Sequence, residues 1–179
     1  ADLAVARPPF PVARALRIAK SLCEAYAPER TRGRVPPPLL PLDVEVTDDD
    51  RALVTFSHDA KPAAASERDL DPAAPYAAPE TFPGGGAVTE AASVYHVAAL
   101  VHHLLTGAAP FDGSTTAAVA VRKLLEAAPS ARDARPELPA ALDEALVRAL
   151  DRDPSRRFAT PAAFAEALAA VVVAAPSAP

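Results

Sequence analysis

Residues 93–107 read SVYHVAALVHHLLTG, and this stretch decides the fold. From Ser93 to Leu105 apolar side chains lie nearly all the way round the predicted helix, so it has no fully polar side. Such a helix is normally buried at the centre of a domain. Thr106-Gly107 ends it, because glycine readily adopts the left-handed backbone that closes many helices. The sequence therefore predicts a domain built around one central helix.

Four other segments have the periodicity of helices. We expect helices over Val12–Tyr26, Thr115–Ala127, Pro139–Leu150, and Pro161 to about Ala174. Pro28 is expected to help end the first of them, and Thr160 to cap the last.

Charged and apolar side chains divide the faces of two of these helices. Arg122, Lys123 and Glu126 are assigned to the solvent side of the second helix. In the third, Leu142, Ala145, Leu146, Ala149 and Leu150 are assigned to the core.

The remaining segments predict one small hairpin and several loops. Short strand-like runs at Val44–Val46 and Leu53–Phe56 flank an acidic turn, so we expect a hairpin over about 44–56 with Asp48–Asp50 at a solvated tip. Val35–Leu42 carries four prolines and is predicted to be an extended loop. Ser57–Pro75 has no period and is predicted to be a long loop, and Gly84–Gly86 a spacer.

Composition excludes some classes of function. The net charge of −5 and the lack of a basic stripe argue against nucleic-acid binding. The longest apolar run, Ala167–Ala175, is too short to span a bilayer, and no signal peptide is visible, so we expect a cytoplasmic protein. Cys23 lies on an apolar helix face without a nearby histidine and is expected in the core.

Four segments resemble, in order, motifs of the Ser/Thr protein kinases, most closely those of bacteria. They are Pro75–Glu80 (PYAAPE), the central stretch 93–107, Pro110–Gly113 (PFDG) and Asp153–Phe158 (DPSRRF). The resemblance implies a mainly α-helical C-terminal kinase lobe with one small β-hairpin. It places an activation-segment-like loop at about 57–80 and a helical subdomain at 88–174. The lobe would cover 1–175, with a tail at 176–179 and the N-terminal lobe absent from this chain.

The same resemblance implies one ion pair. The glutamate of the Ala-Pro-Glu motif and the arginine of the late motif fall on Glu80 and Arg157. A bidentate pair between them would tie a loop to a distant helical segment, so its role is expected to be architectural. Two solvated surface charges are the alternative.

The residues that kinases use for chemistry are replaced. With Gly33–Val35 and Thr47–Arg51 as anchors, the His-Arg-Asp motif falls on Pro36–Pro38, which puts Pro38 at the position of the catalytic base. The usual lysine becomes Leu40 and the metal-binding asparagine Asp43, and Asp-Phe-Gly falls on Phe56–His58. The central-helix aspartate is Ser93, and the threonine expected before Tyr76 is Ala73. Asp59 is the nearest carboxylate, but Ala60-Lys61 does not complete the motif.

We therefore expect no catalytic, cofactor-binding or metal-binding residues. Asp43 with Asp48–Asp50 could hold a cation, yet one carboxylate at the old metal position is a poor Mg²⁺ site. His96 and His103 lie about two helical turns apart, so these histidines and His102 are expected to be structural. Ser66 and Thr81 are either phosphorylation sites or ordinary loop residues, and the sequence does not decide between them.

The favoured function is a pseudokinase that binds a protein partner, with ATP, nucleic acid and membrane not expected as ligands. The alternative is an unconventional ATP-dependent kinase that uses Asp43 and has an N-terminal lobe upstream. A purely structural domain is a third possibility, because a fold alone does not assign function.

Overall fold

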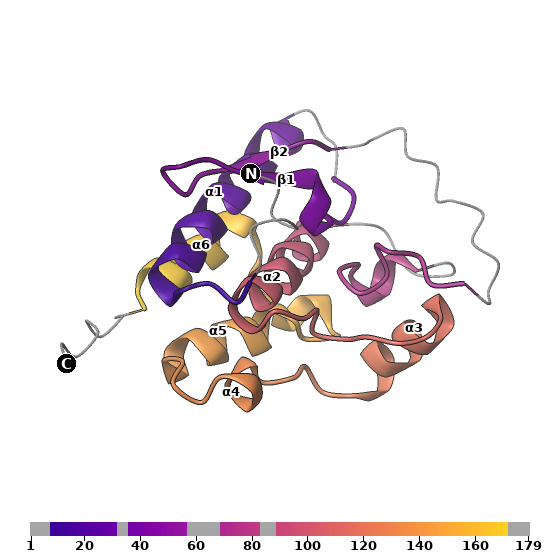
Figure 1. Cartoon of the computed structure of the whole chain (residues 1–179). Coiled ribbons are helices and arrows are strands. Elements are labelled where there is room, and N and C mark those ends of the chain that lie inside the picture. The colour runs from indigo at the N-terminus through magenta and orange to yellow at the C-terminus, as the bar shows by residue number, and fades with distance from the viewer. Residues whose placement is uncertain (1–7, 32–35, 57–68, 83–88, 172–179) are drawn as a thin grey trace.

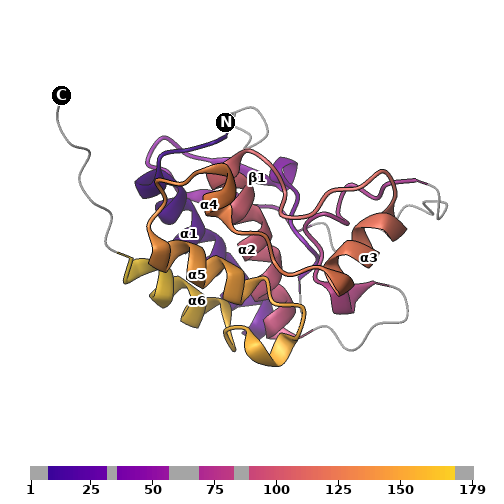
Figure 2. The same ribbon diagram turned by 90° about the horizontal axis from the view of Figure 1, so that it is seen from below.

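The computed structural model describes residues 8–31, 36–56, 69–82 and 89–171. It is mainly α-helical with one two-stranded antiparallel sheet, which confirms the predicted fold class (Figure 1). The central helix is α2 (Glu90–Thr106), and it contacts α1 (Val12–Thr31), α4 (Ala131–Ala134), α5 (Ala140–Ala149) and α6 (Pro161–Ala169). Figure 2 shows α4, α5 and α6 in front of α1 and α2, while α3 (Thr116–Leu125) lies to one side.

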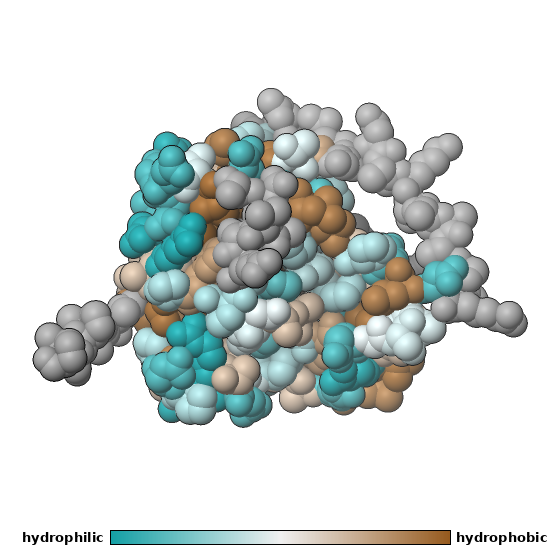
Figure 3. Space-filling view, viewed as in Figure 1, coloured by the Kyte–Doolittle hydropathy of each residue, from teal (hydrophilic) through white to brown (hydrophobic). Residues whose placement is uncertain are grey.

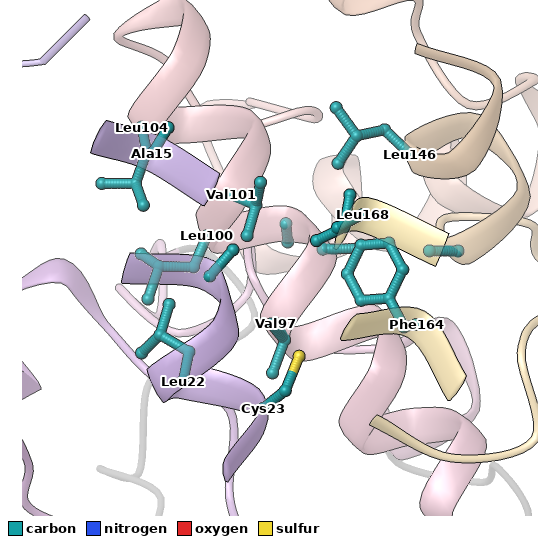
Figure 4. Packing of buried hydrophobic residues seen from close by; sticks show 14 of the residues in the cluster. Ala15, Leu22, Cys23, Val97, Leu100, Val101, Leu104, Leu146, Phe164 and Leu168 are labelled. Carbon is teal, nitrogen blue, oxygen red and sulfur yellow. The ribbon is translucent and has the colours of Figure 1, made fainter. Parts of the chain in front are cut away.

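The core forms where the apolar sides of α2 meet its neighbours. Val97, Leu100, Val101 and Leu104 of α2 lie between side chains of α1 and α6, which include Leu22, Cys23, Phe164 and Leu168 (Figure 4). All of these residues are buried. Gly107 ends α2 with a φ of 85°, and its N–H donates to the carbonyl of His103. The predicted central helix and its glycine cap are thus confirmed.

The end of α1 differs from the sequence prediction. The helix continues through Pro28 to Thr31 instead of ending near Tyr26. A proline removes the backbone hydrogen bond to the carbonyl four residues earlier. Here that carbonyl belongs to the exposed Glu24, near the end of the helix, where water can replace the lost donor.

The predicted hairpin is present and joins β1 (Val44–Val46) to β2 (Ala52–Val54), with Val44 opposite Val54. The second strand was expected at Leu53–Phe56, and it begins and ends earlier in the structure. It is anchored on α1, where the hydroxyl oxygen of Ser21 accepts the N–H of Ala52 at 2.8 Å. The prediction of a solvated tip is wrong for Asp50, whose carboxylate accepts from the Nε of Arg14 at 2.7 Å and also pairs with Arg17. The turn therefore holds the sheet against α1.

The C-terminal half contains the predicted helices and one more. The five residues assigned to the core side of α5 and its end are buried, and the Thr160 hydroxyl caps α6 by accepting the N–H of Ala163. The short α4 was not predicted, and α6 ends at Ala169 rather than near Ala174. The extended loop before the hairpin also ends in a 3₁₀ turn, η1 (Pro41–Asp43).

Some predictions lie outside the described residues. They concern most of the long loop, including Asp59 and Ser66, the spacer Gly84–Gly86, and the tail 176–179. Within the described ranges, no helix has the length and apolar character needed to cross a membrane.

Candidate functional site

The sequence alignment assigns the proline run and η1 to the place of a catalytic loop. Pro36 and Leu39 are buried, and Pro37 and Pro38 are partly buried. The carboxylate of Asp43 accepts the backbone N–H of Leu40 at 2.9 Å, while the Asp43 N–H donates back to the Leu40 carbonyl at 3.0 Å. Asp43 thus closes its own turn through one of its carboxylate oxygens.

An aromatic contact covers the end of the hairpin. The ring of Phe56, at the first position of the Asp-Phe-Gly motif, meets the ring of Tyr26 edge-on at a centroid distance of 5.2 Å. Burial raises the pKa of Tyr26 well above its usual value. A phenyl ring has no oxygen with which to ligate Mg²⁺, so Phe56 cannot serve as the metal ligand that the alignment predicts for this position. Ser57 and His58 lie outside the described residues.

Glu80 and Arg157 form the predicted ion pair. Glu80 lies in the 3₁₀ turn η2 (Pro79–Thr81), and Arg157 follows the 3₁₀ turn η3 (Pro154–Arg156). The Nη1 and Nη2 atoms of Arg157 donate to the two Glu80 oxygens at 2.7 and 2.8 Å. The Arg157 side chain is 0% exposed and also donates to the carbonyls of Ala91, Asp151 and Arg152. The two-solvated-charges alternative is therefore wrong.

Lys123 lies on the opposite side of α3 from the one predicted. Its side chain is buried, and its Nζ donates to the backbone carbonyls of Ala74, Pro75 and Ala77 at 2.7, 3.0 and 2.5 Å. Arg122 and Glu126 do face solvent, where they pair with each other. The lysine thus holds the segment that leads into the Ala-Pro-Glu motif, a contact that the sequence analysis missed.

The three histidines of α2 have different surroundings. His103 accepts from or donates to the Tyr76 hydroxyl through Nδ1 at 2.8 Å, and Nδ1 of His102 lies 3.1 Å from the carbonyl oxygen of Ala108. His96 is fully buried, and neither of its ring nitrogens has a hydrogen-bond partner among the described residues. Burial lowers the pKa of His96 to about 3, and it lowers the pKa of His102 and His103 as well. At neutral pH the structure therefore favours neutral imidazoles on α2.

The remaining candidates are Cys23 and Thr81. Cys23 is buried, and burial raises the pKa of its thiol to about 12. The hydroxyl of Thr81 donates to the carbonyl of Ala78 at 2.7 Å. In the ranges that the structure describes, no three His, Cys, Asp or Glu side chains come together as a possible metal site.

Comparison with known proteins adds independent evidence. No family model matches the chain. The serine/threonine-protein kinase PknJ of Mycobacterium tuberculosis is 40% identical over 99 residues, which cover 54% of this chain and 17% of that protein. The serine/threonine-protein kinase PrkC of Bacillus subtilis is 33% identical over 85 residues, 48% of this chain and 13% of PrkC.

A longer match covers nearly the whole chain. The serine/threonine-protein kinase PknL of Mycobacterium tuberculosis is 29% identical over 174 residues, 95% of this chain and 43% of PknL. The chain thus spans less than half the length of these three curated relatives. The chain is therefore a relative of the bacterial Ser/Thr protein kinases, with a fold like that of their C-terminal lobe.

Proposed function

We propose that this chain is a catalytically inactive kinase-like domain, a pseudokinase, that serves as a protein-binding or scaffolding module. The proposal rests on the sequence alignment that assigns Pro38 to the position of the catalytic base. In kinases an aspartate there accepts the proton of the substrate hydroxyl, and a proline side chain has no atom that can accept one. The architectural pair Glu80–Arg157 is present in the same chain. The substitutions therefore affect the positions that kinases use for catalysis and leave this structural ion pair intact.

The metal-binding positions support the same proposal. Asp43 is the one carboxylate left at a position that would bind Mg²⁺, and its oxygen is engaged by the N–H of Leu40. Magnesium in kinases needs several oxygen ligands with near-octahedral geometry. Because Phe56 replaces the second metal-binding carboxylate, the two sides of the hairpin do not supply a pair of ligands.

A protein-binding role is supported by the outer side of α3. Val121, Leu124 and Leu125 are 52%, 54% and 75% exposed, and apolar surface is visible over this helix at the lower right of Figure 3. Exposed apolar residues that gather on one element are a common feature of protein interaction sites. The same helix binds the segment Ala74–Ala77 on its inner side through Lys123.

A thermal-shift titration with ATP distinguishes the pseudokinase from an unconventional kinase. The longest natural form of the protein is melted with ATP from micromolar to millimolar concentrations, with and without Mg²⁺, beside an active bacterial Ser/Thr kinase. Because a ligand that binds the folded state stabilises it by mass action, an intact nucleotide site raises the melting temperature. We expect no rise. A rise that depends on ATP concentration would favour the unconventional kinase.

The protein-binding role is tested by comparing two matched variants. Leu125→Glu places a charge on the outer side of α3, and Leu53→Glu places one at a 54% exposed position of β2. A partner that the wild type captures from the native extract is expected to bind the Leu53→Glu protein and to be lost with Leu125→Glu. Equal capture by all three proteins would reject the α3 surface. Capture of no partner would favour the purely structural domain.

A further inference from the structure

The helix α3 is held on the domain in a different way from its neighbours. Of its ten residues, Val119 and Lys123 are the buried ones, whereas α5 and α6 bury several apolar side chains each. Val121, Leu124 and Leu125 are exposed. The helix therefore exposes more large apolar side chains than it buries, so apolar burial contributes little to holding it in place.

The apolar contact between α3 and the rest of the domain is a small cluster of its own, to one side of the other helices (Figure 2). Ala74, Phe111 and Val119 are its buried members, and Phe82 packs against them. The main core around α2 shares none of these residues. A satellite cluster of this kind can open while the main core stays packed, because no described side chain belongs to both.

Lys123 supplies most of the polar contact on the inner side of α3. Its side chain is buried, and its Nζ donates to the carbonyls of Ala74, Pro75 and Ala77, one for each N–H of an ammonium group. The ring of Tyr95 lies 5.0 Å from Nζ, within the range of a cation–π interaction. The three hydrogen bonds are charge-assisted, and such bonds are stronger than those between neutral groups.

Two further polar contacts hold the ends of α3. At its start, the Thr116 hydroxyl donates to the carbonyl of Asp69 at 3.0 Å and accepts the N–H of Asp71 at 2.8 Å. At its end, Nη1 of Arg152 donates to the carbonyl of Leu124 at 2.9 Å. The bond to Asp69 and the bond from Arg152 are exposed, so water can replace both when the helix moves away.

The turn that binds Lys123 is fixed to the domain independently of α3. Tyr76 and Ala78 belong to the main core. Glu80, two residues further on, is bound by both terminal nitrogens of Arg157. Separation of α3 from the domain therefore breaks the contacts of Lys123 and leaves the turn in place.

We propose that α3 is a strap that detaches from the domain as a unit, with Lys123 as its latch, while the main core stays closed. The strap is held by one small apolar cluster and by polar contacts, so its opening costs less free energy than unfolding of the whole domain. The open strap presents Val119 in addition to the three apolar side chains that are already exposed. The strap is a property of the fold and does not depend on the proposed function.

Native-state hydrogen exchange of the full chain tests the strap. The backbone amides of residues 120–125 in α3 and 97–104 in α2 are followed by NMR in urea, at concentrations below the unfolding transition. Exchange through global unfolding accelerates steeply with urea because much surface becomes exposed, whereas a local opening responds weakly. We expect the α3 amides to share one faster exchange with a weak urea dependence, and the α2 amides to show the steep dependence. The same steep dependence in both helices would overturn the proposal.

Ile18→Val separates the strap from the main core. Ile18 is fully buried in α1, and loss of one methylene from a core raises exchange through global unfolding about two- to tenfold. The open strap keeps this core contact, so exchange of the α3 amides should not change. An equal acceleration in α2 and α3 would show that the two helices open together and would reject the strap.

Lys123→Met tests the latch. The variant leaves three carbonyls without their donor in the closed state, so exchange of the α3 amides should rise at least about tenfold. Exchange in α2 should rise by the same factor, because the lost contacts stabilise the closed state relative to both the open and the unfolded states.

The matched control for the latch is Arg122→Met, which removes an exposed ion pair with Glu126 on the same helix and should raise α3 exchange less than about threefold. Equal effects of Lys123→Met and Arg122→Met would reject Lys123 as the latch. The measurements on the wild type and on Ile18→Val do not depend on the folding of Lys123→Met, so they decide for or against the strap in every case.

Discussion

Arg157 binds both carboxylate oxygens of Glu80, a residue 77 positions earlier in the chain. Its other donors bind the carbonyls of Ala91, Asp151 and Arg152, so all five N–H groups of the guanidinium have acceptors. One buried side chain thereby joins η2, the start of α2 and the segment after α5. The pair fixes the segment that ends in η2 to the helices packed around α2.

Loss of Arg157 should be among the most destabilising single changes in the chain. Arg157→Met leaves the Glu80 carboxylate and three carbonyls without their donor, and removal of one partner of a buried ion pair costs about 3–5 kcal/mol. The matched control is Arg156→Met, because Arg156 is 72% exposed and lies 3.5 Å from Asp151. That change should cost less than about 1 kcal/mol. Urea unfolding measures both, and equal midpoints for the two variants would contradict an architectural role for the pair.

The sequence predicted this pair because it resembles two kinase motifs, one with a glutamate at position 80 and one with an arginine at position 157. The formation of a bidentate pair depends mainly on the presence of these two side chains. The sequence did not predict the location of Lys123. Val119, which lies four residues earlier on the same side of α3, is buried, so helical periodicity alone directs Lys123 inward. The sequence analysis assigned Lys123 to the solvent side because its side chain is charged. The carbonyl groups that bind Lys123 in the buried position belong to the turn Ala74–Ala77, which is far away in the sequence.

The proline positions were predictable to different degrees. The run Pro36–Pro38 forms no regular element, as expected, because several consecutive prolines remove the backbone donors that a helix needs. The prediction that α1 ends near Pro28 was wrong. The cost of the lost backbone hydrogen bond depends on whether the carbonyl without a donor is exposed to water. For the candidate site, the alignment assigned Pro38, Asp43 and Phe56, and these assignments stay predictions. The bond between Asp43 and Leu40 was not predicted, because it depends on the 3₁₀ turn of the folded chain.

Acid should destabilise the protein through His96. Its folded-state pKa is about 3, below the usual value near 6.5, so stability is lost as the pH falls below 6.5 and the unfolded chain takes up a proton. At pH 5 this effect amounts to about 2 kcal/mol, and at pH 7.5 it is close to zero. His96→Leu removes the titrating ring. Its stability relative to the wild type should therefore be about 2 kcal/mol more favourable at pH 5 than at pH 7.5.

Urea unfolding of both proteins at the two pH values provides the measurement for His96. If the difference in the free energy of unfolding between wild type and His96→Leu is the same at pH 5 and pH 7.5, the prediction is contradicted. That result would show that His96 is protonated at pH 5 in the folded state.

The turn of the hairpin should also lose stability in acid, but at a lower pH, because the titrating group is a carboxylate. The hydrogen bond from Arg17, with that from Arg14, lowers the pKa of Asp50 below its usual range. The stability that this pairing provides is therefore present above the ordinary aspartate pKa and is lost as the pH falls through the lower folded value. Asp50→Asn removes the charge, and asparagine tolerates the left-handed backbone at this position, where φ is 61°.

The melting temperatures of wild type and Asp50→Asn between pH 2 and 7 test this pairing. The variant should melt lower than the wild type near neutral pH, and the two curves should converge in acid. Asp48→Asn, at an exposed position of the same turn, is the control and should follow the wild type throughout. A constant gap between wild type and Asp50→Asn down to pH 2 would mean that the carboxylate contributes through its shape rather than its charge.

Phosphotransfer is the most direct test of the central claim that this kinase-like chain is not a catalyst. The longest natural form of the protein is incubated with γ-labelled ATP and Mg²⁺ or Mn²⁺, with a mixture of serine and threonine peptides, beside an active bacterial Ser/Thr kinase. With Pro38 at the position of the base and Phe56 at that of a metal ligand, we expect neither autophosphorylation nor labelled peptide above the no-enzyme background. Incorporation of label that rises with protein concentration, and that is abolished by Asp43→Ala, would contradict the claim.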